Sequence, residues 1–329
     1  MALVSVIIPT YNNPKQLERS LDSVLNQTFK DVEVIVVNDG STVDYSNLES
    51  KYNSQSNIQF YYKANAGPGM ARQLGLDKSS GKYIQYLDAG DELLPYKLEK
   101  QVHILNLNQS IILTYGLSMI EGNPKILHRP KMKHYKYEDL IKIAVATRKW
   151  HTSAPLWHYS KRKYWSNYYN GEDVYHDFNV GLNNKGQVHF LNEILVNLVY
   201  DNPDGGLSNA SEQQKNHKRF AKDTVDLNLY MLEKLKAKDH LKNKVYRERL
   251  SERVYHASMR VYLTGYKRES LILLKTARKT SKSLVKLMEI LILYFVIYLP
   301  IKKKRPIFQF LYKVRRKLLS PDIHQYRYI

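Results

Sequence analysis

Polar and acidic residues follow three short apolar runs in the first third of the chain. Pro9-Thr10-Tyr11, Asp39-Gly40-Ser41 and Asp88-Ala89-Gly90-Asp91 each stand at the end of such a run. The carboxylates of Asp88 and Asp91 are hard oxygen donors, which suit Mg²⁺ or Mn²⁺. Because the chain has no cysteine, any metal must be held by Asp, Glu, His or phosphate oxygens. These three segments are therefore the first candidates for a ligand-binding site.

The apolar runs predict buried β-strands, and helical patterns separate them. Strands are expected at Val4–Pro9, Val32–Val37, Ile58–Tyr62 and Tyr83–Leu87. Helices are expected after Asn13-Pro14, after Gly67-Pro68-Gly69 and from Pro95. This alternation predicts an α/β fold with a mostly parallel sheet flanked by helices. In such sheets ligands bind beyond the carboxyl ends of the strands, where the three polar segments fall.

The second half of the chain predicts a different organisation. Residues 115–215 are less regular, and from about Gln213 the pattern becomes helical and charged, with Leu227, Met231 and Leu235 at helical spacing. We therefore predict an α/β domain over residues 1–215 and a helical, basic C-terminal region over residues 216–329.

Three stretches resemble family 2 glycosyltransferases, in that family's order and approximate spacing. They are Val4–Asp44 (VSVIIPTYNNPKQLERSLDSVLNQTFKDVEVIVVNDGSTVD), Ala66–Leu94 (AGPGMARQLGLDKSSGKYIQYLDAGDEL) and Gly171–Asp173 (GED). The resemblance implies a GT-A fold, a Rossmann-like sheet flanked by helices, with residues 1–215 as the catalytic domain. It also implies an inverting, hexosyltransferase-type enzyme that uses a nucleoside diphosphate sugar, with UDP-sugars favoured. The acceptor would be a glycan or a lipid-linked sugar in bacterial surface polysaccharide biosynthesis.

The resemblance implies nucleotide-binding roles for the strand ends. Pro9, Thr10, Tyr11 and Asp39 would hold the base, since a carboxylate can accept the imide N–H of uracil and Tyr11 offers a flat face for stacking. The alternative for Asp39 is a turn residue with no ligand.

A second group would lie along the ribose and diphosphate. It consists of Gly67, Pro68, Arg72 and Asp88. A glycine turn lets the backbone approach the ligand, and Arg72 would neutralise phosphate charge. The alternative for Arg72 is an ion pair with a carboxylate at the end of the sheet.

The resemblance also implies a metal site and a catalytic base. Asp88 and Asp91 would hold Mn²⁺ or Mg²⁺ shared with the diphosphate, although the family's usual motif has an acid where this chain has Gly90. An acidic turn that caps the next helix is the alternative. Asp173 would take the proton from the acceptor hydroxyl, and Glu172 would support it.

Tryptophans before the Glu-Asp pair are the candidate acceptor contacts. Trp150 and Trp157, with Trp165, could stack on sugar rings, and each is equally compatible with a place in the core. The spacing of His151, His158 and His176 matches no metal-binding motif, so we predict no metal role for them. The segment 200–208 resembles the family's late donor-covering loop but lacks the His that many relatives carry there.

The net charge of +20 favours an anionic partner, or simply keeps the protein soluble. The apolar run Ile290–Ile301 would span about 18 Å as a helix, short of a hydrocarbon core of about 30 Å. Lys302-Lys303-Lys304-Arg305 follow it directly. We therefore favour an interfacial helix on an anionic membrane surface over a buried or a spanning helix. Because no basic leader precedes Val4, we expect a cytoplasmic protein at the inner face of the membrane.

Two other functions remain open from the sequence. A non-catalytic sugar-nucleotide-binding subunit of a glycan-assembly complex is the main alternative, supported by Gly90 and by the missing late His. A nucleic-acid-binding protein is disfavoured, because the basic cluster adjoins the apolar run rather than interleaved aromatic residues.

Overall fold

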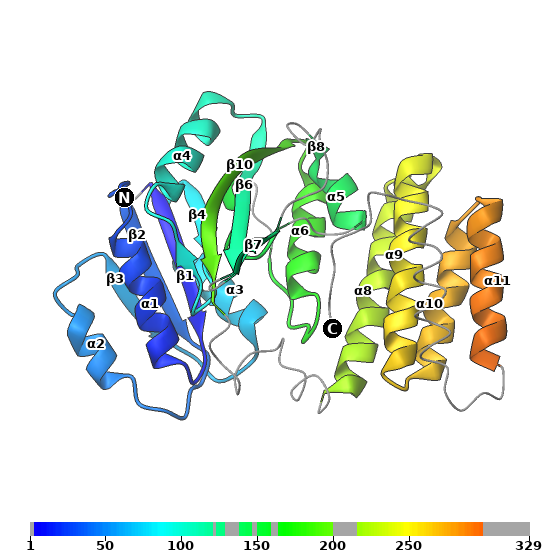
Figure 1. Cartoon of the computed structure of the whole chain (residues 1–329), viewed down its shortest axis with the longest axis horizontal. Coiled ribbons are helices and arrows are strands. Elements are labelled where there is room, and N and C mark those ends of the chain that lie inside the picture. Colours follow the sequence, from blue (N-terminus) through cyan, green and yellow to red (C-terminus); the bar gives the residue numbers. More distant parts are fainter. Residues whose placement is uncertain are drawn as a thin grey trace.

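The computed structural model describes residues 3–120, 123–128, 138–146, 150–158, 164–199 and 216–298. In Figure 1 a sheet with its helices occupies one side of the molecule, and a stack of helices occupies the other. The predicted combination of an α/β fold and a C-terminal helical region is confirmed.

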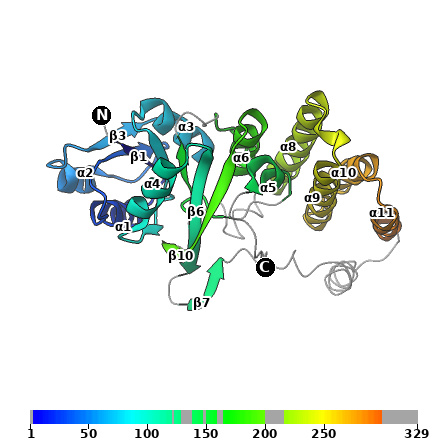
Figure 2. The ribbon, with the colours of Figure 1, turned by 90° about the horizontal axis from the view of Figure 1, so that it is seen from above.

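Four parallel strands form the first half of the sheet. They are β1 (Val4–Thr10), β2 (Val32–Asn38), β3 (Ile58–Tyr62) and β4 (Tyr83–Tyr86), in the order β3-β2-β1-β4. The helices that connect them are α1 (Pro14–Leu25), α2 (Ser46–Tyr52) and α3 (Pro68–Lys78). Helix α1 connects β1 to β2 on one side of β1, whereas α3 connects β3 to β4, which lies on the other side of β1. Right-handed crossovers therefore put these two helices on opposite faces, as Figure 2 shows.

The second half of the sheet mixes directions. Beyond β4 the order is β9 (Leu156–His158), β6 (Ile111–Ile120), β10 (Gln187–Leu198) and β5 (Glu92–Leu93), with β9 and β5 antiparallel to their neighbours. β7 (Asn123–His128) pairs with β6, and β8 (Glu138–Asp139) pairs with β10. The helices of this half are α4 (Lys97–Leu107), α5 (Leu140–Ala146) and α6 (Glu172–Asn183). The helix expected from Pro95 thus begins at Lys97.

The C-terminal helices stack side by side, away from the sheet (Figure 1). They are α8 (His217–Ala237), the 3₁₀ turn η3 (His240–Lys242), α9 (Lys244–Leu263), α10 (Lys267–Thr280) and α11 (Leu284–Tyr298). Their buried residues form one hydrophobic cluster with side chains of α5 and α6, such as Val145 and Phe178. The helical region therefore shares a core with the segment before it, and the boundary near residue 215 stays a prediction.

Candidate functional site

The ends of β1 and β2 form one continuous surface. The backbone N–H of Asp39 donates to the carbonyl of Thr10 at 2.9 Å, and that of Thr42 donates to Asn12 Oδ1 at 2.8 Å. The hydroxyl of Tyr45 lies 2.8 Å from Thr10 Oγ1 and accepts from the N–H of Asn13. Pro9 and Thr10 are buried by this network, whereas Tyr11 is 47% exposed. Of the four residues predicted to bind the base, Pro9, Thr10, Tyr11 and Asp39, only Tyr11 keeps a face open for stacking.

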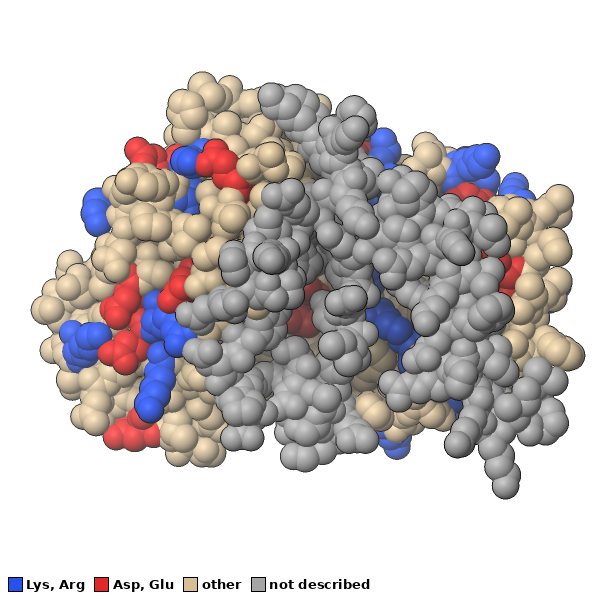
Figure 3. Space-filling model, in the orientation of Figure 1, with Lys and Arg blue, Asp and Glu red and all other residues tan. Residues whose placement is uncertain are grey.

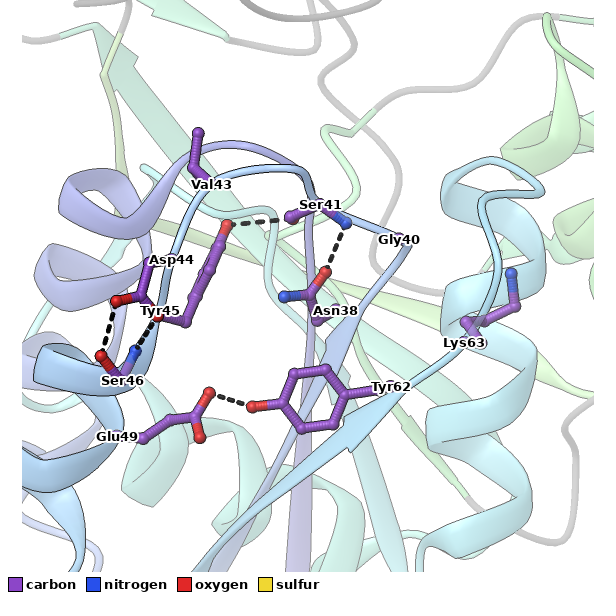
Figure 4. A pocket seen from close by; sticks show the side chains of 10 residues that line it. All are labelled: Asn38, Gly40, Ser41, Val43, Asp44, Tyr45, Ser46, Glu49, Tyr62 and Lys63. Carbon is purple, nitrogen blue, oxygen red and sulfur yellow. Dashed lines mark hydrogen bonds between the residues drawn. The ribbon is translucent and has the colours of Figure 1, made fainter.

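A cavity of about 450 Å³ opens beside these strand ends. Figure 4 shows that it lies between the turn after β2, the start of α2 and the end of β3. Tyr45, Tyr62 and Lys63 line it, together with Glu49, whose carboxylate accepts from the Tyr62 hydroxyl. Its volume and its mixture of aromatic and polar groups are typical of a small-molecule site.

Asp39 anchors the loop that leads into α3. Its carboxylate accepts from Lys63 Nζ at 2.6 Å and from the backbone N–H groups of Ala66 and Gly67 at 3.0 and 2.8 Å. The residue is only 4% exposed. In this structure these donors occupy the carboxylate that was predicted to receive uracil. Gly67 has a φ of +90°, and Pro68 begins the helix, so the positive end of α3 faces the strand ends.

Asp88, Asp91 and His151 lie together where β4 ends. One ligand atom of each lies within 4.8 Å of the others. Two carboxylate oxygens and an imidazole nitrogen are a donor set that Mn²⁺ accepts, so the residues present fit the predicted metal. Asp91 is buried and accepts from Ser153 Oγ, and the backbone N–H of Asp88 donates to the same hydroxyl. The segment that carries His151 is thereby joined to the acidic turn.

Gly90 is required by the backbone of this turn. Its φ is +108°, a conformation that side-chain-bearing residues rarely adopt, and its N–H donates to Ser20 Oγ at 2.9 Å. The positive φ thus explains why glycine stands at the third position, and the second acid of the turn is Asp91 at the fourth position.

Arg72 joins the acidic turn to Glu172, the neighbour of the predicted catalytic base Asp173. Its Nη2 donates to Asp88 Oδ1 at 2.6 Å, and its Nη1 donates to Glu172 Oε1 at 3.2 Å. Its guanidinium lies 4.7 Å from the centre of the Trp165 ring, and the residue is 4% exposed. The alternative of an ion pair with a carboxylate at the end of the sheet is thus observed. The phosphate contact of Arg72 stays a prediction, since both of its terminal nitrogens donate to these carboxylates here.

Glu172 and Asp173 begin α6, where the helix dipole favours negative charge. Burial, and then the charge of Asp173, raise the pKa of Glu172 to about 7, with Arg72 opposing. Asp173 is partly buried, and its Oδ1 accepts from the N–H of Val174. A Cβ on Gly69 would lie 3.2 Å from the Glu172 side chain, so α3 and α6 begin side by side.

The site can be compared with known proteins. A family model described as glycosyl transferase family 2 matches residues 5–166. An uncharacterized glycosyltransferase of Rickettsia bellii is 45% identical over 126 residues, which are 38% of this chain and 18% of that protein. One of Rickettsia prowazekii is 36% identical over 138 residues, 41% of this chain and 43% of that protein. The match thus spans less than half of either relative's length. Through residues 5–166 the chain belongs to glycosyltransferase family 2.

Solved structures agree with the GT-A fold expected of this family. Staphylococcus aureus TarS, residues 1–349, has a TM-score of 0.55 at 16% identity and covers 88% of this chain and 90% of its own. A mannosyltransferase of Pyrobaculum calidifontis, in complex with GDP-Man and Mn²⁺, has a TM-score of 0.55 at 15% identity, with 96% and 87% covered. These similarities establish the fold alone.

The structure places Trp150 and Trp157, the candidate acceptor contacts, in the core, which is the alternative that the sequence left open. Both are buried, at 5% and 2% exposed, because their rings pack in the core. The Trp150 indole donates to Asp177 at 3.0 Å, and Trp157 packs edge-on against His176. Trp165 is equally buried and stacks on the same histidine. The late loop at residues 200–208 lies outside the described residues.

Sequence reasoning predicted no metal role for His151, yet the tertiary structure brings it to the acidic turn of this family 2 domain. Sixty residues separate it from Asp91, and no spacing rule covers such a distance. Its position next to Thr152-Ser153, whose serine supports Asp91, becomes meaningful only in the folded chain.

Replacing Gly90 with Asp would give the acid that the family motif usually has at this position. We nevertheless expect Gly90→Asp to lower the free energy of unfolding by about 1–3 kcal/mol, because of the positive φ, and not to tighten Mn²⁺ binding. Gly90→Ala is the matched control, since a Cβ there meets nothing closer than 3.5 Å. Urea unfolding should give similar losses for both variants. A Gly90→Asp protein of native stability with tighter Mn²⁺ binding would contradict this explanation.

The binding of Mn²⁺ should depend strongly on pH. Burial, and then the charge of Asp88, raise the pKa of Asp91 to about 8. A metal must displace this proton, so we expect the affinity to fall about tenfold per pH unit below that value, with about one proton released on binding. Without metal, the free energy of unfolding should fall as pH rises from about 4 towards about 8. In this range Asp91 is ionised in the unfolded chain but still protonated in the folded one.

Calorimetry in two buffers of different ionisation enthalpy measures the proton release. The control is Asp91→Asn, which should release no proton and bind weakly. An affinity that stays constant between mildly acidic and neutral pH would rule out a protonated Asp91.

Proposed function

We propose that this chain transfers a sugar from a nucleoside diphosphate donor to an acceptor hydroxyl, with inversion at the anomeric carbon. One observation carries the proposal. The buried guanidinium of Arg72 pairs with Asp88, of the acidic turn, and with Glu172, next to the candidate base Asp173. Donor-side and acceptor-side carboxylates therefore share one edge of the sheet, as a direct displacement requires.

The donor side suits a nucleotide sugar. Tyr11 and the cavity beside Tyr45 and Tyr62 offer aromatic surface for a base, and the N-terminus of α3 favours the anionic diphosphate. Asp88, Asp91 and His151 would hold Mn²⁺ or Mg²⁺, which offsets the charge on the departing diphosphate. We propose a UDP-sugar as the donor. TarS has been solved with UDP-GlcNAc, which supports this choice for a chain of the same fold.

The acceptor side centres on the start of α6. Asp173 would accept the proton of the attacking hydroxyl as the new bond forms, a contribution of about 10²–10⁴-fold. Glu172, paired with Arg72, would keep the first turn of α6 in place. We propose a glycan or lipid-linked sugar of a surface polysaccharide as the acceptor.

The described charges do not favour a nucleic-acid function. On the face drawn in Figure 3, described Lys and Arg side chains are interspersed with Asp and Glu and do not form a continuous basic patch. The non-catalytic alternative also loses its support from Gly90, because Asp91 and His151 complete a donor set with Asp88.

The test is nucleoside diphosphate release from a panel of UDP- and GDP-sugars, with and without Mn²⁺. We expect metal-dependent hydrolysis of one UDP-sugar. In Asp88→Asn it should fall at least about 10²-fold, because the metal's charge stabilisation is worth several kcal/mol. The matched control is Asp226→Asn, an exposed residue of α8, which should leave the rate unchanged. Nucleotide binding without turnover would favour the non-catalytic subunit, and absence of binding would overturn the proposal.

A further inference from the structure

The last described helix, α11, exposes an apolar face. Seven of its side chains are between 46% and 78% exposed, and they recur every three or four residues, so they lie on one side of the helix. They are Leu284, Val285, Met288, Leu291, Ile292, Phe295 and Tyr298. Helix α11 forms the outer end of the helical stack, and no other described element covers this face (Figures 1 and 2).

The charged residues of α11 point the opposite way. The only charged residues of this helix are Lys286 and Glu289, and both side chains are largely buried. Lys286 Nζ contacts Glu252 of α9, lies 2.9 Å from Glu289 Oε2, and packs over the ring of Tyr255. A surface helix normally turns its charges to water and its apolar face to the core. In α11 both charged residues instead lie on the inner side, and the outer side is apolar, which indicates that the outer face meets an apolar medium.

The described length of α11 is shorter than the hydrocarbon core of a bilayer. Its 15 residues extend about 22 Å, less than a hydrocarbon core of about 30 Å. None of the described helices is both long and apolar enough to cross a membrane. Such a helix can instead lie in the plane of the membrane, with its apolar side chains among the upper acyl chains.

The basic residues after and beside α11 indicate which apolar medium its outer face contacts. The sequence that follows, residues 299–320, contains eight Lys or Arg residues and no Asp or Glu. Next to α11, helix α10 adds exposed Lys275, Arg278 and Lys279. An anionic lipid surface attracts such a segment, whereas a second copy of this chain would bring two strongly basic segments together. We propose that the outer face of α11 docks in the plane of an anionic membrane, with the basic segment after it on the lipid headgroups. This does not depend on the proposed sugar transfer.

Co-sedimentation of the full chain with vesicles tests the proposal. We expect binding to vesicles of equimolar phosphatidylcholine and phosphatidylglycerol, weak binding to pure phosphatidylcholine, and loss of binding at high salt. Leu291→Glu and Phe295→Glu should each lower the partition coefficient about tenfold or more. The matched control is Leu107→Glu, since Leu107 of α4 is 70% exposed and far from α11 (Figure 1). Donor hydrolysis should be unchanged in all three variants.

Two further measurements separate the other occupants of this face. In Phe295→Trp, quenching of the added tryptophan's fluorescence by brominated lipid reports contact with acyl chains. If the variant were quenched no more than the native protein, residues 299–329 would cover the face, and the proposal would be overturned. Light scattering without lipid should give a monomer. A dimer that Phe295→Glu dissociates would assign the face to a second copy. Equal binding of the wild-type and the two charged variants, or no binding to anionic vesicles, would also overturn it.

Discussion

Asp173→Asn should lower the rate of sugar transfer by about 10²–10⁴-fold while it leaves the fold and the donor affinity intact. Asn keeps the shape of the side chain but cannot take a proton. The Asp173 carboxylate accepts a hydrogen bond from the N–H of Val174, and an amide oxygen can accept the same bond. The measurements are kcat with saturating donor, donor affinity by calorimetry, and Tm.

Asp226→Asn serves as the matched control, because it makes the same chemical change at an exposed position of α8. It should leave all three quantities unchanged. The roles of the two adjacent acids can also be separated. Glu172→Gln should lower Tm, since it removes a buried partner of Arg72. If Asp173→Asn retained most of the rate, or if transfer proceeded with retention of configuration, Asp173 would not be the base.

Arg72→Met should reduce both stability and activity. It leaves the carboxylates of Asp88 and Glu172 without their shared cation, and loss of one partner of a buried ion pair costs about 3–5 kcal/mol. Transfer should fall at least about 10²-fold as well, since misplacement of reacting groups by about an ångström has that effect. Arg72→Lys should recover only part of either loss. A single ammonium cannot reproduce the planar fork that reaches both acids and stacks on Trp165.

Urea unfolding and kcat/KM measure these effects. Arg19→Lys is the control, because Arg19 is partly exposed and its Nε lies 3.9 Å from Glu92. That change should alter the free energy of unfolding by less than about 1 kcal/mol. A double-mutant cycle adds a sharper criterion. Arg72→Met combined with Glu172→Gln should cost less than the sum of the single changes, since the two residues share one interaction. Full additivity would mean that the pair is not energetically coupled.

The local elements of the fold were predictable from the sequence alone. The strand β3 has the predicted bounds, and β1 extends the predicted run by one residue. Buried parallel strands are continuous apolar runs ended by turn residues, a signal contained within a few positions. The Gly67-Pro68 helix start and the acidic turn from Asp88 to Asp91 are equally local. The family resemblance rests on the same short segments, so the family of residues 5–166 could be recognised before any contact was known.

The partners of the site residues were decided only by the tertiary structure. Arg72 is 16 residues from Asp88 and 100 from Glu172, and their contact depends on where the sheet places α3 and α6. His151 reached the acidic turn in the same way. Trp150 and Trp157 could have stacked on a sugar or filled the core, because an aromatic ring suits both, and packing put them in the core. Helix α11 is apolar nearly all round, so its pattern could not tell its inner face from its outer one. The ion pairs of Lys286 with Glu252 and Glu289 orient the helix, because a buried charge must be paired.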